Sequence, residues 1–177
     1  MEVRSWSAAD EDVLGHSSYC VVGSTLLRFG GFNGQAEVNT TAMRNEDGTW
    51  QQLATTGDLP SPRARAAAVS VDNTTMLVWG GAIFVEGAPS SRYGPNTCAD
   101  AGALHILDVP ARRWRTVAPA DWVPPPRQGH TATNIGGGDI IIVGGRVHGV
   151  TPANYQEQAD AGRSLLWRRR RDGGVGG

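Results

Sequence analysis

A stretch that occurs three times is the feature that most constrains this chain. Each copy begins with small or polar residues, passes through a turn and an apolar segment, and ends on two glycines, as in GHTATNIGGGDIIIVGG at residues 129–145. The other two copies, aligned on their closing glycines, are GHSSYCVVGSTLLRFGG and RAAAVSVDNTTMLVWGG, and the alignment needs no gap. Such a repeat predicts an array of similar units that bury their apolar faces against one another.

Residues outside the aligned stretch repeat at matching distances. Trp50 precedes Arg63 by as many residues as Trp114 precedes Arg127. Each of these arginines also stands equally far before the next glycine pair. A chance match of glycine pairs would not bring tryptophan and arginine into step, so we interpret the repeat as structural.

The composition agrees with many short elements joined by turns. The 177 residues include 24 glycines and 10 prolines, and 40% are hydrophobic, enough for a core. No apolar run is long enough to span a membrane, and the first twelve residues lack the apolar core of a secretory signal. We therefore expect a cytoplasmic protein, with the nucleus as the alternative, in which Cys20 and Cys98 are reduced.

The charge is unevenly distributed along the chain. The net charge is −1, but residues 162–177 contain five arginines and one acidic residue, which leaves an acidic excess elsewhere. Nucleic acid is therefore not an expected partner. Arg168 to Arg171 could be a nuclear-localisation patch or a solvated tail, and we predict an irregular or disordered tail, rich in arginine and glycine, over residues 146–177.

Each complete unit is predicted to contain four short antiparallel strands. Turn residues such as those in NEDG, which tolerate positive φ, separate the strands, and a long insertion follows the second glycine pair. The predicted strands are residues 16–22, 26–29, 40–44 and 49–53 in the first unit, 66–71, 76–79, 103–108 and 113–117 in the second, and 130–135 and 140–143 in the third.

These units resemble kelch repeats. The resemblance rests on the glycine pair after an apolar strand, the tryptophan in the following outer strand, and the loops GDLPSPR and WVPPPRQGH, and it covers roughly residues 6–145. It implies an all-β, partial kelch-type β-propeller of the galactose-oxidase-like, central-domain type, with four-stranded antiparallel blades. Residues 1–145 would form the propeller fragment, with blades at about 13–53 and 66–117 and an incomplete one at 130–145.

Three blades do not close a propeller, which has roughly 4–8. Three interpretations follow: a part of a longer protein, a truncated product, or a half that pairs with another copy. We favour truncation, because the tail leaves the repeat in mid-unit. The unfinished blade edges also predict self-association.

Several residues are expected to serve the fold. Glycines would occupy positions with positive φ or close packing, and tryptophans would fill the wedge between blades. His16 and His130 share one aligned position, where the middle copy has Ala66, and a structural role is expected for both histidines. The predicted structural residues are Gly30, Gly31, Trp50, Gly80, Gly81, Trp114, His130, Gly144 and Gly145.

The residues do not favour catalysis. The copper-radical oxidases that share this fold use two tyrosines, two histidines and a tyrosine-linked cysteine, whereas the histidines here are expected to be structural. We therefore predict a protein that is not an enzyme, with no catalytic residues, metal site or cofactor. The alternative is a fragment of a propeller-fold enzyme, such as a kelch-type oxidase.

The expected function is a scaffold or adaptor that binds a protein partner. Successive turns of an antiparallel meander alternate between the two ends of a sheet, so the loop between strands two and three lies at the same end as the crossover to the next blade. These loops are the long ones and carry arginine and aromatic residues, which are enriched at interfaces. The predicted binding residues are Arg63, Arg65, Phe84, Glu86, Arg92, Tyr93, Arg127 and Arg146.

Overall fold

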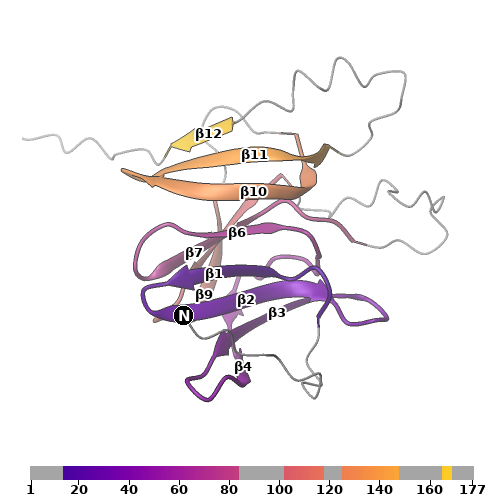
Figure 1. Cartoon of the computed structure of the whole chain (residues 1–177), viewed down its shortest axis with the longest axis vertical. Helices are drawn as coiled ribbons and strands as arrows, with labels where there is room; N and C mark the ends of the chain where they lie inside the picture. Colours follow the sequence, from indigo (N-terminus) through magenta and orange to yellow (C-terminus); the bar gives the residue numbers. More distant parts are fainter. Residues whose placement is uncertain (1–13, 84–101, 118–124, 148–164, 169–177) are drawn as a thin grey trace, which may run out of the picture.

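The computed structural model describes residues 14–83, 102–117, 125–147 and 165–168, and these ranges form an all-β fold. No helix in them is long and apolar enough to span a membrane. Three sheets follow one another along the long axis of the molecule (Figure 1). The strands are β1 (Ser18–Val22), β2 (Thr25–Phe32), β3 (Glu37–Arg44), β4 (Trp50–Leu53), β5 (Thr56–Gly57), β6 (Ala67–Ser70), β7 (Thr75–Trp79), β8 (Leu104–Asp108), β9 (Arg113–Val117), β10 (Arg127–Gly136), β11 (Asp139–Val147) and β12 (Leu165–Arg168).

The first sheet is the predicted four-stranded meander. Its order is β1-β2-β3-β4, and every neighbouring pair is antiparallel. The turn between β3 and β4 closes through bonds predicted by its composition, because the Asp47 carboxylate accepts the Thr49 N–H at 2.8 Å. The glycine pair of this sheet interrupts the β2–β3 ladder with a change of register after Phe29.

The second sheet contains the four predicted strands and one more. The order β5-β9-β8-β7-β6 adds β5, which comes from the crossover after the first sheet and pairs in parallel with β9. The Thr56 N–H donates to the Arg112 carbonyl at 3.0 Å, and the Asp58 N–H donates to the Trp114 carbonyl at 3.1 Å. The crossover therefore begins as a short strap on the outer edge of the next sheet, where the sequence analysis predicted only a loop.

The third sheet is larger than predicted. Its order is β10-β11-β12, and β11 continues to Val147. Antiparallel pairing joins β12 to the edge of β11, with Ile142 opposite Leu165 and Asp139 opposite Arg168. The expected irregular tail over residues 146–177 therefore contains a strand. Leu165 to Trp167 could be interpreted as a strand from the sequence, but its separation from β11 matches no spacing in the other units.

The first hairpin differs from the others by one residue. Val22 pairs with Thr25 across a two-residue turn, whereas the second sheet needs residues 72–74 for the same turn, which closes with a bond from the Val71 N–H to the Thr75 carbonyl. The shorter turn moves every residue of β1 by one position relative to the glycine pair. The ungapped alignment is therefore wrong before this turn.

Pairs of residues at the start of each hairpin give the corrected correspondence. Gly15 lies opposite Phe32, Ala64 opposite Ala82, and Gln128 opposite Arg146. The next residues along the chain, His16, Arg65 and Gly129, therefore occupy one structural position, and their φ angles of 58°, 58° and 65° agree. The residue that corresponds to His130 is Ser17, and the predicted equivalence of His16 and His130 is incorrect.

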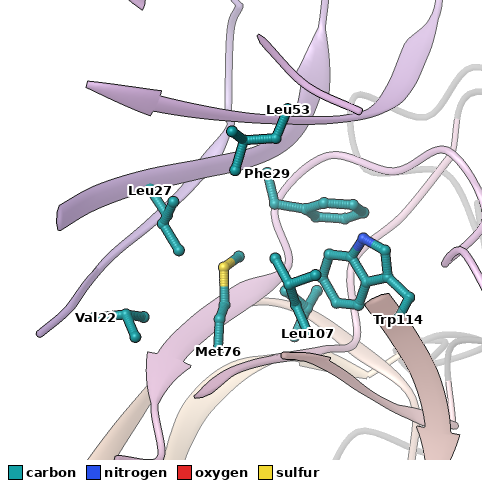
Figure 2. Close-up of a cluster of buried hydrophobic side chains, with 8 residues drawn as sticks. Val22, Leu27, Phe29, Leu53, Met76, Leu107 and Trp114 are labelled. Carbon is teal, nitrogen blue, oxygen red and sulfur yellow. The ribbon is translucent and has the colours of Figure 1, made fainter. Parts of the chain in front are cut away.

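The core lies between the sheets. One cluster joins the first two sheets (Figure 2), and the Phe29 and Trp114 rings meet edge to face there, with centroids 5.2 Å apart. Trp114 lies in this cluster between the two sheets, where a wedge role was predicted for it, and its side chain is 1% exposed. A second cluster, which includes Trp79 and Ile140, joins the second sheet to the third.

The glycine pairs provide a direct test of this stacking. An alanine Cβ at Gly80 would lie 2.5 Å from the Arg127 carbonyl oxygen and 2.5 Å from the His130 ring, whereas no described atom lies within 4 Å of the same position at Gly144. The two φ angles, 69° and 70°, are nearly equal. We expect Gly144→Ala to cost about 1–2 kcal/mol from backbone strain and Gly80→Ala at least about 1–3 kcal/mol more from overpacking. Urea unfolding measures the difference, and equal costs would show that the sheets do not stack in this way.

Candidate functional site

The glycine pairs mark the end of the sheets at which binding residues were predicted. We call this the glycine-pair end. It comprises Gly30-Gly31, Gly80-Gly81, Gly144-Gly145 and the residues that lie beside them at the start of each hairpin. The antiparallel order of the first sheet places the β2–β3 connection and the crossover into β6 at this end, and the hairpin turns at the other.

Arg63 and Arg127 lie at this end but are inaccessible to a partner. Both side chains are 0% exposed. The Arg63 guanidinium donates to the Gly80 carbonyl at 3.0 Å and to the Ser61 carbonyl at 2.9 Å, and that of Arg127 donates to the Gly144 carbonyl at 3.0 Å. Their prediction as binding residues is corrected: each guanidinium replaces water with backbone carbonyls of its own chain.

The same two arginines connect successive sheets through their backbones. The Gly31 N–H donates to the Arg63 carbonyl at 2.8 Å, and the Gly81 N–H donates to the Arg127 carbonyl at 2.9 Å. Each arginine therefore accepts from the glycine pair of the preceding sheet and donates to that of the following sheet. Glycine is required at Gly80, because its positive φ and the close approach of the Arg127 carbonyl leave no room for a side chain.

A second row of backbone bonds runs through the positive-φ positions. The Arg65 N–H donates to the His16 carbonyl at 2.9 Å, and the Gly129 N–H donates to the Arg65 carbonyl at 2.9 Å. The Arg65 side chain remains exposed. One of its guanidinium nitrogens donates to Gln128 Oε1 at 3.3 Å, and another lies 3.5 Å from His16 Nε2. These contacts bring together residues of all three hairpins.

The other predicted binding residues divide into two groups. Arg146 is described and exposed, and it follows the third glycine pair, as expected for this end. Phe84, Glu86, Arg92 and Tyr93 belong to the long insertion and lie outside the described residues. Of the predicted residues that the structure describes, Arg65 and Arg146 are accessible, and the geometry adds His16.

His130 lies inside the contact between the second and third sheets. Its ring meets the Trp79 ring edge to face, with centroids 4.9 Å apart, and its side chain is 6% exposed. Burial, together with the positive charge of Arg127, lowers the pKa of His130 to about 4. The predicted structural role of this residue therefore fits its surroundings.

Trp50 differs from Trp114 in its surroundings. It lies half-buried on the side of the first sheet that faces away from the second, where it contacts Tyr19 with ring centroids 5.9 Å apart. The guanidinium carbons of Arg28 and Arg44 lie 4.7 and 5.3 Å from its ring centroid. Trp50 therefore does not fill a wedge between two described blades, as was predicted for it, because no described sheet precedes the first.

The described side chains do not converge on a reactive centre. His16 lies at the glycine-pair end, His105 lies within the second sheet 3.4 Å from the Thr116 hydroxyl, and His130 is packed on Trp79. Among the residues in the described ranges, no group of three histidine, cysteine or carboxylate side chains could hold a metal ion. Cys20 is a free thiol, and burial raises its pKa to about 12, which disfavours the reactive thiolate.

Comparison with known proteins identifies the repeat. The model of the KLHDC2/KLHL20/DRC7 Kelch-repeats domain matches residues 6–155, which is most of the chain. The chain belongs to the kelch-repeat family. The all-β fold with antiparallel sheets, predicted from the repeat, is that of kelch blades.

The curated relatives of this kelch-repeat chain are longer proteins. Adagio-like protein 1 of Oryza sativa subsp. japonica is 32% identical over 148 residues, which cover 78% of this chain and 21% of that protein. Acyl-CoA-binding domain-containing protein 4 of Arabidopsis thaliana is 32% identical over 74% of this chain and 18% of its own length. An F-box/kelch-repeat protein of Arabidopsis thaliana is 32% identical over 71% of this chain and 26% of its own length.

Sequence reasoning missed several residues that join the kelch blades. The Asn134 side chain donates to the carbonyls of Ser70 and Val71 at 2.9 and 2.8 Å, and the Ser18 hydroxyl donates to the Ala66 carbonyl at 2.7 Å. These residues are not repeated between units, so the alignment does not single them out. The two-residue turn at Gly23-Ser24, by contrast, was visible and could have revealed the shift in the first hairpin.

The two arginines of the second crossover provide a matched test of their roles. Arg63→Met removes the buried guanidinium and leaves the Gly80 carbonyl without this donor, so we expect a loss on the order of 3 kcal/mol in the free energy of unfolding. Arg65→Met changes an exposed side chain and should stay within about 0.5 kcal/mol of wild type. Urea unfolding compares them, and a similar loss in both variants would contradict the assignment.

The His130 environment predicts a dependence of stability on pH. An unfolded histidine has a pKa of about 6.5, so between that value and about 4 the unfolded chain binds a proton that the folded chain does not. The free energy of unfolding should therefore fall as the pH falls through this window, by at most about 3 kcal/mol from this residue. His130→Phe should lose this component while keeping the ring contact with Trp79. Unfolding curves of both proteins between pH 4 and 7 measure it, and parallel curves would contradict it.

Proposed function

We propose that this kelch-repeat chain is a non-catalytic interaction module that binds a protein partner at its glycine-pair end. The observation that carries the proposal is Arg65, an exposed arginine held in the left-handed backbone conformation with a φ of 58°. Its position is fixed by backbone bonds to His16 and Gly129. An arginine presented on a rigid frame suits protein recognition, because less side-chain freedom is lost on binding.

The choice of residue at this position supports a binding role. The third hairpin has Gly129 there, which is the residue expected at positive φ, whereas the first two have His16 and Arg65. A residue other than glycine in this conformation costs roughly 1–2 kcal/mol. Side chains retained at such a cost are candidates for function, and both project from the end of the sheets at which the long loops were predicted to bind.

The surroundings of Arg65 indicate what the partner offers. Within the described ranges, its acceptors are the Gln128 amide oxygen at 3.3 Å, which is uncharged, and a ring nitrogen of His16 at the long distance of 3.5 Å. A carboxylate of a partner would form a shorter, charge-assisted bond with the guanidinium. Arg146, exposed beside the third glycine pair, adds positive charge at the same end. We therefore infer a partner surface with acidic side chains.

The separation of the histidines supports a binding module over an oxidase. A copper-radical centre would need histidine and tyrosine side chains to meet, whereas, among the described residues, His130 is packed on Trp79, and Tyr19 contacts Trp50 on the outer side of the first sheet. The predicted compartment remains the cytoplasm, with the nucleus as the alternative.

The binding end can be tested with a photo-crosslinking amino acid. Placed at His16, it should capture a partner from the cell, whereas the same group at Glu46, in a hairpin turn at the opposite end, should not.

For a purified partner, Arg65→Gly should weaken binding at least tenfold, about 1.4 kcal/mol. The same change should raise the free energy of unfolding by about 1 kcal/mol, because glycine relieves the backbone strain.

The opposite directions of these two effects make the test specific. Titration calorimetry measures affinity and urea unfolding measures stability, with Glu46→Ala as the control for both. Weakened binding in a destabilised variant would indicate damage to the fold. Unchanged affinity for Arg65→Gly, or capture from Glu46 instead of His16, would show that the binding surface lies elsewhere.

A further inference from the structure

The first and last sheets carry apolar side chains on the sides that point away from the second sheet. The contacts inside the molecule distinguish two sides of every sheet. In the first sheet, we call the side that packs on the second sheet the front. In the second sheet, the front is the side that packs on the third sheet, and in the third sheet it is the corresponding side. The opposite side of each sheet is the back. Fronts pack on backs at both internal contacts. The back of the first sheet and the front of the third have no described sheet against them.

The front of the third sheet has the exposure expected of an uncovered contact surface. The residue directly before the glycine pair is Phe29 in the first sheet, Trp79 in the second and Val143 in the third. Phe29 and Trp79 are 0% and 1% exposed, whereas Val143 is 47% exposed. Ile141, which shares this side of β11 with Val143, is only half-buried. Equivalent positions are thus buried wherever another sheet follows.

The back of the first sheet is uncovered along β1, whereas Arg28 and Ala42, further across the same side, are buried. Tyr19 and Val21 are 47% and 55% exposed. Tyr19 pairs with the residue of the next strand that stands two positions before the first glycine of the pair. Ala68 and Ala132 pair with the equivalent residues in the second and third sheets. Those alanines pack against the two internal clusters. The back of the first sheet therefore also has the placement of a contact surface.

The two uncovered surfaces are of complementary kinds. Trp50 on the back of the first sheet and Trp114 on the back of the second occupy equivalent positions. Each pairs with one of the last two residues of the neighbouring strand. Trp114 packs on a front residue, Phe29, at 5.2 Å. The front of the third sheet, with Ile141 and Val143, offers aliphatic surface for the aromatic pair of Tyr19 and Trp50.

We propose that a second copy of this chain covers both surfaces, with the front of the third sheet of each copy on the back of the first sheet of the other. This contact continues the arrangement already repeated twice within the chain. Two chains joined at both ends give six sheets, within the roughly 4–8 of closed propellers. Two identical contacts of this kind close under a two-fold axis, which covers both of these surfaces in each copy.

The assembly can be tested by light scattering after size exclusion, with the full chain at tens of micromolar. The wild-type mass should be twice the 18.7 kDa of one chain. Val143→Arg should block the front contact and Val21→Arg the back contact, and each variant alone should run at the mass of one chain. Leu59→Arg, which changes a residue of the crossover that is 44% exposed, is the matched control and should keep the doubled mass.

Mixing the two single-chain variants makes the test specific for this geometry. Each variant retains one intact surface, and the two surfaces are of opposite kinds. One of the two contacts in a mixed pair is therefore wild type while the other carries both arginines, so an equimolar mixture should contain more of the doubled mass than either variant alone. Circular dichroism and thermal unfolding check that all variants fold. A wild-type chain that runs at the mass of one chain or of more than two, a variant that stays doubled alone, or a mixture with no more of the doubled mass than either variant would overturn the proposal.

Discussion

The stacking of the three sheets depends on one arginine in each crossover, which forms hydrogen bonds with the sheet before it and with the sheet after it. The Arg63 carbonyl accepts from Gly31, and its guanidinium donates to the Gly80 carbonyl. A buried guanidinium is tolerated because backbone carbonyls replace its hydration. The arrangement also requires glycine in the pair that precedes each arginine, since a Cβ at Gly30 would meet the Arg63 carbonyl and one at Gly80 the Arg127 carbonyl. Arginine and the glycine pair therefore recur together, with each arginine 17 residues before the glycine whose carbonyl accepts from its guanidinium.

The repeat predicted the strands of the first two sheets, their antiparallel pairing and the packing of Trp114, because each follows from local pattern. It could not predict where the Arg63 guanidinium ends, since the Gly80 carbonyl becomes its acceptor only after the sheets stack. The shift before the first hairpin turn was hidden, because a gapless alignment cannot show a loop that is one residue shorter. The partner of β12 depends on an open edge of β11, which no spacing in the sequence encodes.

Equivalent positions of the repeat differ in burial according to whether another sheet lies beside them. Only the second sheet has a described sheet on both sides, and Leu77 and Val78, which point to its opposite sides, are 1% and 0% exposed. In an array where each unit contacts only its neighbours, most of the stability resides in such shared contacts. Damage to the second sheet should therefore affect the other two, whereas changes at either end remain local.

The strap formed by β5 means that the repeat and the structural module have different boundaries. Thr56 and Gly57 follow β4 in the chain but are hydrogen-bonded to β9 of the next blade. A blade exchanged between related proteins by cutting at Pro60 would leave this strap paired with a foreign strand. A cut directly after Leu53 would transfer the strap, the buried arginine and their acceptors together. Recombination of such arrays, whether by evolution or in the laboratory, is therefore best tolerated immediately after the fourth strand.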